Sequence, residues 1–330
     1  MKNTRAVLLY LLLSLVGASF TASADPDPNF HIYLCFGQSN MEGAARPENQ
    51  DQSCDSRFQM MSTANCSNRK LGQWYTATPP LAHCNSGLGP TDYFGRTLVE
   101  KLNKNIKVGV IVVAVGGCDI KFFEENNAES YVRTQQNWLQ QIAANYNNNG
   151  YKRLLECAQM AQKDGVIKGI LLHQGETNNM QQDWPNRVKA IYDKLLSQLG
   201  LSAKDVPLLV GETRRDGACN GHNNVIAKMP SVISNSYVIS SQGLEKANDE
   251  FHFSANGYRE FGKRYAEQML KLLPASDQDG SNNSQSNNQN NNQSRNQNQN
   301  RLRQNRQQCR QFRRLAGGEN LQDLQNARSG

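Results

Sequence analysis

Short apolar runs alternate with longer amphipathic stretches through the first three quarters of the chain. We interpret five of these runs as strands: His31–Phe36, Val108–Val115, Ile167–His173, Val206–Gly211 and Tyr237–Ser240. Valine and isoleucine fill the second run almost continuously, which is typical of strands that are buried on both faces. The runs therefore predict a sheet with both faces covered.

The stretches between the runs carry apolar residues at helical spacing. They predict helices over Asp92–Leu102, Tyr151–Lys163 and Trp184–Leu199. A last helix is expected over Ser254–Leu273, with the Ser254 hydroxyl as its N-cap. Strands that alternate with helices over this length predict an α/β fold in which a parallel sheet has helices on both faces.

The first 24 residues have the pattern of a secretory signal peptide. Lys2 and Arg5 precede the apolar stretch Ala6–Val16, and Ala22-Ser23-Ala24 forms a cleavage site of small residues. No later run reaches the roughly 18 apolar residues that a membrane span needs. We therefore expect a secreted or periplasmic protein without a membrane span.

The composition changes after Pro274, so we divide the mature chain into a folded domain, 25–274, and a tail, 275–330. Asparagine, glutamine and serine dominate 281–300, which leaves too little apolar surface for a core. The tail predicts a disordered extension or, alternatively, an electrostatic tether to an anionic surface.

The formal net charge of +7 is concentrated at the two ends. Lys2 and Arg5 contribute +2, and the tail, with eight arginines against four acidic residues, contributes +4. The remaining +1 on the folded domain gives no reason to expect that it binds nucleic acid.

Eight cysteines are present, and an oxidising compartment would permit disulfides. Cys54, Cys66 and Cys84 lie in polar, loop-like sequence and are the best candidates for a bridge. Cys35 and Cys157 lie in apolar patterns, which favours buried free thiols. Because the spacings form no paired C-x-x-C units, we expect no structural zinc site.

Residues with catalytic chemistry gather at the ends of the predicted strands. Gly37 ends the first strand and permits a tight turn, which would hold Ser39 at the carboxyl edge of the sheet. Open α/β sheets bind ligands at that edge. Three more segments lie at or beside it: Gly116-Gly117, His173-Gln174-Gly175-Glu176 and Asp249-x-x-His252.

These segments supply the groups that acyl transfer needs. Ser39 is the candidate nucleophile, His252 the base that takes its proton, and Asp249 the carboxylate that orients the imidazole. The backbone N–H groups of Ser39 and Gly117 can point at the developing oxyanion, and the Gln174 side chain can add an amide N–H.

Supporting roles are expected for three neighbouring side chains. His173 ends an apolar run, which favours a structural histidine over a base. Glu176 can either orient the catalytic histidine in place of Asp249 or hold the serine turn, and we favour the second role. Asn40, next to the nucleophile, is assigned to the same support.

Residues 44–90 form a long, proline-containing stretch that follows the serine turn directly. Loops of this length in compact domains are usually functional, so we expect this one to cover the site. Trp74, Tyr75 and His83 are its candidate substrate contacts. In the alternative interpretation, the two aromatic side chains pack the loop onto the core.

The ordered blocks resemble those of the SGNH hydrolases. They are similar to the sialate O-acetylesterase and acetylxylan esterase branch, carbohydrate esterase family six, over about residues 29–273. The resemblance is carried by Gly37-Gln38-Ser39-Asn40-Met41-Glu42-Gly43, Gly116-Gly117, His173-Gln174-Gly175-Glu176 and Asp249-x-x-His252-Phe253-Ser254.

The resemblance implies a flavodoxin-like three-layer α/β/α sandwich with a five-stranded parallel sheet. It implies removal of acetyl groups from sugars without a metal or cofactor. Ser39, Asp249 and His252 would be the triad, and Ser39, Gly117 and Gln174 the oxyanion hole. Gln174 stands where SGNH hydrolases usually have an asparagine.

The expected function is a secreted serine esterase that removes O-acetyl groups from plant polysaccharide, with acetylated xylan as the first candidate. A sialate O-acetylesterase is the alternative within this mechanism. It would need a cation for the substrate carboxylate. Arg46, Arg96 and Arg214 are available for that contact.

Two further classes remain open from the residues. A glycosidase would use a pair of carboxylates from Glu42, Glu176 and Glu212. A non-catalytic carbohydrate-binding or adhesion protein would use Trp74, Tyr75 and the arginine-rich tail.

Overall fold

The computed structural model describes residues 25–279. The expected signal peptide, 1–24, and all of the tail from residue 280 lie outside the described residues, so both stay predictions. The folded part continues slightly past Pro274, because a 3₁₀ turn, Ala275–Asp277, is hydrogen-bonded to the segment that begins at Leu102. There the carbonyl of Asp277 accepts a hydrogen bond of 2.9 Å from the Asn103 N–H.

The core of the fold is one sheet with the strand order β3-β2-β4-β1-β5-β6-β7. All five predicted strands are in it and run parallel to one another. Their order is that of a flavodoxin-like doubly wound sheet. The five are β1 (Asp27–Gly37), β4 (Lys107–Ala114), β5 (Gly165–His173), β6 (Leu208–Gly211) and β7 (Ser236–Ile239).

The expected number of five strands was wrong, because the stretch 44–90 adds two more. β2 (Phe58–Met61) pairs parallel to β4, and β3 (Trp74–Thr76) pairs antiparallel to β2. They are short and flanked by turns, and they extend the sheet on the side of β4 away from β1.

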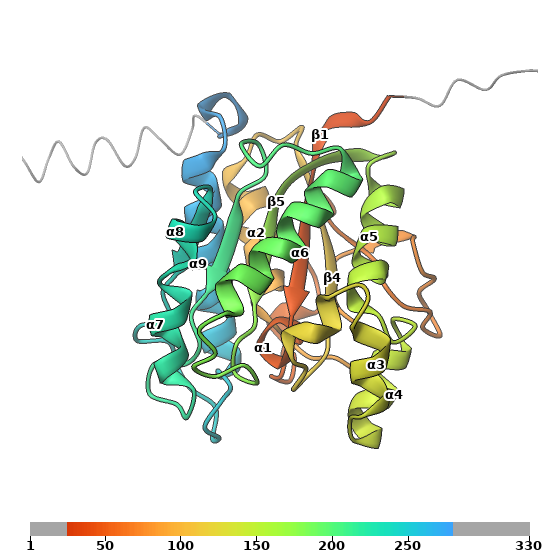
Figure 1. Cartoon of the computed structure of the whole chain (residues 1–330). Helices are drawn as coiled ribbons and strands as arrows, with labels where there is room; N and C mark the ends of the chain where they lie inside the picture. Colours follow the sequence, from red (N-terminus) through yellow and green to blue (C-terminus); the bar gives the residue numbers. More distant parts are fainter. Residues whose placement is uncertain (1–24, 280–330) are drawn as a thin grey trace, which may run out of the picture.

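Helices cover both faces of the sheet, which confirms the three-layer sandwich (Figure 1). α2 (Pro90–Lys101) and α9 (Ala255–Leu272) lie on one face, and α5 (Gly150–Ala161) and α6 (Trp184–Leu199) lie on the other. These four match the predicted helices, and the Ser254 hydroxyl caps α9 by accepting from the Gly257 N–H. Five shorter helices are α1 (Ser39–Glu42), α3 (Ala128–Arg133), α4 (Asn137–Ala144), α7 (Asn223–Ile226) and α8 (Met229–Val232).

The central strand β1 shows why its stretch Ile32–Phe36 is an unbroken apolar run. Ile32, Leu34 and Phe36 pack into the core on the α5–α6 side. Tyr33 and Cys35 point to the opposite face and pack into the core under α2 and α9. Successive side chains of a strand alternate between faces, so a strand covered on both sides is apolar at every position. No helix of residues 25–279 is long and apolar enough to cross a bilayer.

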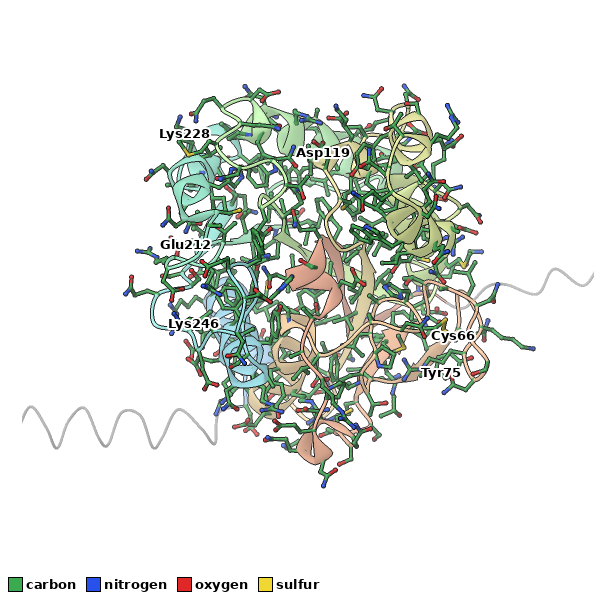
Figure 2. All side chains as sticks on the ribbon, turned by 90° about the horizontal axis from the view of Figure 1, so that it is seen from below. Cys66, Tyr75, Asp119, Glu212, Lys228 and Lys246 are labelled. Carbon is green, nitrogen blue, oxygen red and sulfur yellow. A yellow bond between two sulfur atoms is a disulfide. The ribbon has the colours of Figure 1, made fainter. Side chains whose placement is uncertain are left out.

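A disulfide joins Cys66 to Cys84 in the stretch that carries β2 and β3. Cys54, the third candidate for a bridge, is free, and Cys35 and Cys157 are buried free thiols as predicted. Figure 2, seen toward the carboxyl ends of the parallel strands, shows Cys66 on one flank of the molecule and the β6–β7 side on the other.

Candidate active site

Three turns meet at the carboxyl edge of the sheet because the strands that precede them are neighbours. β1 lies between β4 and β5, at the point where the order of the strands reverses. The turns carry Ser39 after β1, Gly116 and Gly117 after β4, and Glu176 and Thr177 after β5. They open on a pocket of about 520 Å³, whose lining residues are Gln38, Ser39, Gly116, Gly117, Trp138, Glu176, Thr177, Phe251 and His252.

The turn before Ser39 has no room for a side chain at Gly37. A Cβ at Gly37 would lie 2.0 Å from the carbonyl oxygen of His173 on β5. That carbonyl also accepts a hydrogen bond of 3.0 Å from the Gln38 N–H. The chain therefore turns tightly against β5, and Ser39 begins α1 directly at the end of the central strand.

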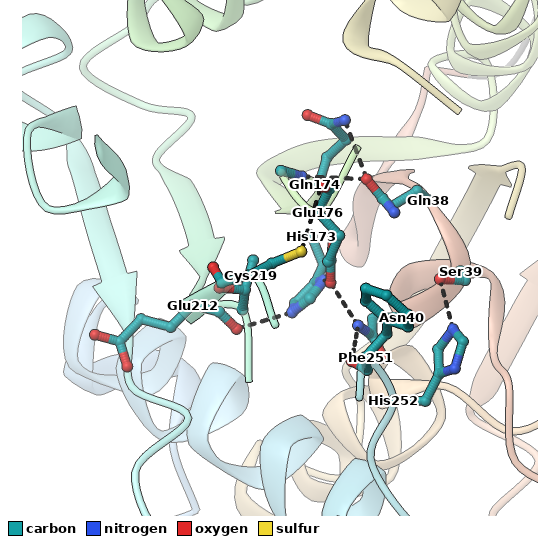
Figure 3. Close-up of polar contacts among 12 residues, drawn as sticks. Gln38, Ser39, Asn40, His173, Gln174, Glu176, Glu212, Cys219, Phe251 and His252 are labelled. Carbon is teal, nitrogen blue, oxygen red and sulfur yellow. Dashed lines mark hydrogen bonds and ion pairs between the residues drawn. The ribbon is translucent and has the colours of Figure 1, made fainter. Parts of the chain in front are cut away.

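The structure brings together Ser39, His252 and Asp249. The imidazole Nε2 of His252 lies 2.9 Å from Ser39 Oγ, and its Nδ1 lies 2.8 Å from Asp249 Oδ2 (Figure 3 shows the contact with Ser39). Asp249, and not Glu176, thus holds the histidine. This arrangement can deprotonate the serine hydroxyl and stabilise the imidazolium that results.

The Asp249 carboxylate is held ionised by its surroundings. Partial burial raises the pKa of Asp249, but hydrogen bonds from the backbone N–H groups of Phe251 and His252 and from the imidazole outweigh that effect. The pKa of Asp249 is lowered to about 2. The backbone donors lie 2.7 Å and 2.8 Å from Asp249 Oδ1.

Two backbone N–H groups are free to bind an oxyanion beside Ser39. Gly117 has a φ of 68°, a conformation that favours glycine, and it follows Gly116, where a Cβ would lie 3.6 Å from Ser39 Cβ. In residues 25–279, neither the Ser39 N–H nor the Gly117 N–H donates to another group. Both were predicted as oxyanion-hole donors, and the geometry keeps them available.

Gln174, predicted as the third donor, lies elsewhere. Its side chain is completely buried and does not line the pocket. Its Nε2 faces Gln38 Oε1 at 3.1 Å, the Cys118 carbonyl at 3.2 Å and Asn178 Oδ1 at 2.6 Å. The indole of Trp184 donates to its carbonyl oxygen. Because three acceptors already share two N–H groups, Gln174 has no donor left for an oxyanion.

Asn40 connects the nucleophile turn to the rest of the site. Its Nδ2 donates to Glu176 Oε1 at 2.5 Å and to the Phe251 carbonyl at 3.1 Å. Its Oδ1 accepts from the Tyr258 hydroxyl of α9 at 2.5 Å. Glu176 and Asn40 therefore tie together the loops that follow β1, β5 and β7, which is the supporting role expected of both.

The other carboxylates and His173 do not form a second catalytic group. His173 is buried, its Nε2 contacts the Glu212 carbonyl at 2.9 Å, and burial lowers its pKa, so it is a neutral structural residue. The Glu42 carboxylate contacts His83, and that of Glu212 contacts Arg215. Neither carboxylate lines the pocket, so a glycosidase pair is not assembled there.

The stretch 44–90 does not cover the pocket, so that expectation was wrong. Trp74 packs on Phe30 with ring centroids 4.7 Å apart, and its indole donates to Asp164. Tyr75 accepts from the Lys70 N–H, and His83 is buried. None of the three candidate contacts lines the pocket, and packing onto the fold accounts for Trp74.

Two aromatic side chains that the sequence analysis passed over form the outer walls of the pocket. Trp138, on the short helix α4, is 48% exposed, and Phe251, inside Asp249-x-x-His252, is 44% exposed. One available signal was the position of Phe251, because a large apolar side chain within a polar catalytic motif suggests contact with a ligand.

The three arginines considered for an anionic substrate lie away from the pocket. Arg214 is 4% exposed and donates to the backbone carbonyls of Asp249 and His252. Arg96 pairs with Asp92 at 2.8 Å, and Arg46 borders a different surface pocket. None of them lines the pocket beside Ser39.

Comparison with known proteins agrees with this arrangement. A family model described as "Carbohydrate esterase, sialic acid-specific acetylesterase" matches residues 29–271. A protein from Arabidopsis thaliana has a similar fold, with a TM-score of 0.55 and 19% identity over 74% of this chain and 99% of its own. The crystal structure of NanS gives a TM-score of 0.56 and 15% identity over 75% of this chain and 98% of its own.

The family match spans most of the chain and contains every strand-end segment described above. The two solved structures support the fold, whereas the family model supports the chemistry. The chain is a carboxylic ester hydrolase with a three-layer α/β/α fold, and it belongs to the carbohydrate esterase family of sialic acid-specific acetylesterases.

Proposed function

We propose that this carbohydrate O-acetylesterase acts on a neutral acetylated polysaccharide, with acetylated xylan as the substrate class, through an acetyl-enzyme on Ser39. The observation that carries the mechanism is the contact chain from Ser39 through His252 to Asp249. The family match supports an acetylated carbohydrate as the substrate.

In the proposed reaction, His252 Nε2 takes the Ser39 proton as Oγ attacks the carbonyl carbon of the acetyl group. The Asp249 carboxylate stabilises the imidazolium. The carbonyl electron pair moves onto the oxygen, which then accepts hydrogen bonds from the backbone N–H groups of Ser39 and Gly117. When the tetrahedral intermediate collapses, the bond to the sugar oxygen breaks and His252 gives that oxygen the proton. Water, deprotonated by His252, then attacks the acetyl carbon, and His252 returns the proton to Ser39 Oγ as acetate leaves.

The charge of the pocket supports a neutral substrate. Its lining, within the described chain, includes Glu176 but no arginine or lysine. A sialate carboxylate would be bound best by a cation, above all a bidentate arginine. Trp138 and Phe251 instead offer exposed aromatic surface, which suits the apolar face of an uncharged sugar ring. The description of the family supports sialate as the second candidate.

We also propose that the protein is secreted or periplasmic. The pattern of residues 1–24 supports export. The Cys66–Cys84 disulfide adds to this, because such bonds persist in oxidising compartments. The tail, 275–330, is proposed to take no part in the chemistry, because the triad and its backbone donors all precede it in the folded domain.

Acetate release tests the substrate class. The enzyme is given neutral acetylated xylo-oligosaccharides and O-acetylated sialic acid at matched concentrations, and kcat/KM is compared, with Ser39→Ala alongside. We expect a clear preference for the neutral substrate and loss of both activities in the variant. Equal or better turnover of the sialic acid would overturn the neutral substrate, and an active variant would overturn the serine mechanism.

A further inference from the structure

An ester bound at Ser39 has one direction left for its acyl chain. The carbonyl oxygen faces the N–H groups of Ser39 and Gly117, and the oxygen of the departing alcohol faces His252, which protonates it. The acyl chain must therefore point away from the imidazole. His252 precedes α9, and Figure 1 shows α9 to the left of β1 and α4 to its right. The acyl chain thus points toward the side of the pocket that α4 forms.

The indole of Trp138, on α4, closes the pocket on that side. A Cβ at Gly117 would lie only 2.9 Å from Cη2 of the Trp138 indole, so the indole packs directly on the glycine. The next indole atoms, Cζ2 and Cζ3, would lie 3.7 Å and 3.8 Å from that Cβ. The six-membered ring therefore meets Gly117 with its edge. Both residues line the pocket, so this edge faces the space beside the oxyanion donor.

The indole edge is held in place by contacts at both of its ends. The neighbouring Leu139 is buried in the core and anchors α4. The indole Nε1 of Trp138 donates a hydrogen bond of 2.8 Å to Gln136 Oε1, just before the helix. Gly117 is held as well, because its carbonyl accepts a hydrogen bond of 2.9 Å from the Thr177 hydroxyl. The wall on the acyl side is therefore formed before any substrate binds.

We propose that Trp138 sets the length of the acyl group, because its indole edge admits a methyl group beside Gly117 and blocks longer chains. The inference rests on the proposed acyl transfer at Ser39 and adds a specificity-determining residue to it. Phe251 lies at the other wall, where its ring is beside the imidazole of His252, with centroids 6.4 Å apart (Figure 3). The Trp138 edge thus meets the acyl half of the ester, whereas Phe251 meets the sugar half.

A wall of this kind discriminates by repulsion. Each further methylene of the acyl chain must displace the indole edge or leave its place beside Gly117, and such clashes reject a wrong ligand without strengthening the right one. One methylene more or less in an apolar pocket changes kcat/KM by roughly 10–200-fold. A butyryl ester has two methylenes more than an acetyl ester, so we expect it to react at least about 10²-fold more slowly.

A series of 4-nitrophenyl esters tests the inference, because its members share one leaving group and differ only in the acyl chain. The value of kcat/KM is compared for the acetate, propionate and butyrate in wild type, Trp138→Ala and Trp138→Phe. Trp138→Ala should reduce the preference for acetate over butyrate at least about 10-fold, mainly through faster turnover of the butyrate. Trp138→Phe, whose ring is shorter, should lie between. Small shifts of the triad affect both esters alike and cancel in this ratio.

Phe251→Ala is the matched control at the opposite wall. It should keep the acetate-to-butyrate ratio of wild type and lower kcat/KM for acetylated xylo-oligosaccharides. The inference is overturned if wild type hydrolyses acetate and butyrate equally well, if Trp138→Ala keeps the wild-type ratio, or if Phe251→Ala changes the ratio as much. Thermal midpoints confirm folding, which we expect because the Trp138 side chain is 48% exposed. Should Trp138→Ala fail to fold, the ratio in Trp138→Phe decides.

An equilibrium measurement separates the inference from the proposed function. Methylboronic and propylboronic acids form tetrahedral adducts with the serine, and their alkyl groups stand for the acetyl and butyryl chains. Their inhibition constants should differ widely in wild type and come closer together in Trp138→Ala. A ratio that ignores Trp138 in an enzyme that needs Ser39 would overturn the inference alone. An active Ser39→Ala variant would instead overturn the acyl transfer, and a preference for sialic acid would overturn the neutral substrate.

Discussion

The two sides of the pocket are built in different ways. Ser39 stands at the end of the central strand, between Gly37, which has no space for a side chain, and Asn40, which is fully buried. His252 stands on a surface turn before α9, next to the 44%-exposed Phe251. The nucleophile is positioned by the packing of the sheet, whereas the base is positioned by hydrogen bonds to its own loop.

Those hydrogen bonds come from two side chains of other elements. Arg214 donates to the carbonyls of Asp249 and His252, and Asn40 donates to that of Phe251. The sheet tolerates little movement, because its close-packed interior transmits any change of volume. The histidine turn lacks such packing, so we expect single polar substitutions to move the base far more easily than the nucleophile.

The largest effect should come from removing either the nucleophile or the base. Ser39→Ala and His252→Ala are each expected to lower kcat by on the order of 10⁴-fold or more, and the double variant should be no worse than either, because the two groups act as a unit. The measurement is hydrolysis of 4-nitrophenyl acetate, with thermal midpoints to confirm folding. A double variant much slower than both singles would mean that the two sides act independently.

Acid pH should disable the histidine side alone. Because the pKa of Asp249 is lowered from 3.8 to about 2, its carboxylate stays charged until the solution is strongly acidic. Its contribution to stability is complete above pH 3.8 and is lost as the pH falls through about 2. The rate should also fall at acid pH, because a protonated imidazole cannot accept the serine proton.

The measurement for that prediction is kcat/KM across the acid range, with the thermal midpoint followed in parallel. Asp249→Asn should lower the rate at neutral pH by up to about 10⁴-fold, since the imidazole loses its orienting carboxylate. A rate that stays flat into strong acid would contradict a histidine base.

A smaller effect is expected from Arg214→Met. The variant should lower kcat by roughly 10- to 100-fold through misplacement of the base, and KM should change less. Arg215→Met is the matched control, because this exposed neighbour contacts Glu212 and Gln242 and leaves the histidine turn alone. The control should keep the rate of wild type, because neither contact reaches the histidine turn, although loss of the pair with the buried Glu212 lowers the thermal midpoint. Equal rates in the two variants would show that Arg214 does not position the turn.

The sequence predicts the central part of this fold well. The apolar runs mark every long strand, and the helical spacing gives α6 with its bounds, Trp184–Leu199. β2 and β3 escaped detection because they lie inside the long, proline-containing stretch 44–90, where their three or four residues form no separate apolar run. β2 also pairs with β4, which begins more than 30 positions further along the chain.

The chemistry of the site was predictable as far as it follows strand ends. The residues of Ser39, Gly116-Gly117 and His173-Gln174-Gly175-Glu176 meet because the adjacent parallel strands β1, β4 and β5 bring their carboxyl ends together. The position of Gln174 was not predictable, because its amide is oriented by Asn178 and Trp184, and nothing local signals these contacts. Trp138 reaches the pocket from α4, a helix that the apolar pattern did not indicate.

The strands at the two borders of the sheet are short: β3 has three residues and β7 has four. A border strand exposes unpaired backbone groups, and a long flat one invites another chain to add to it. Here the long strands are interior and each border offers only a few such groups. A neighbouring molecule would therefore find little unpaired backbone at either border to which it could add a strand.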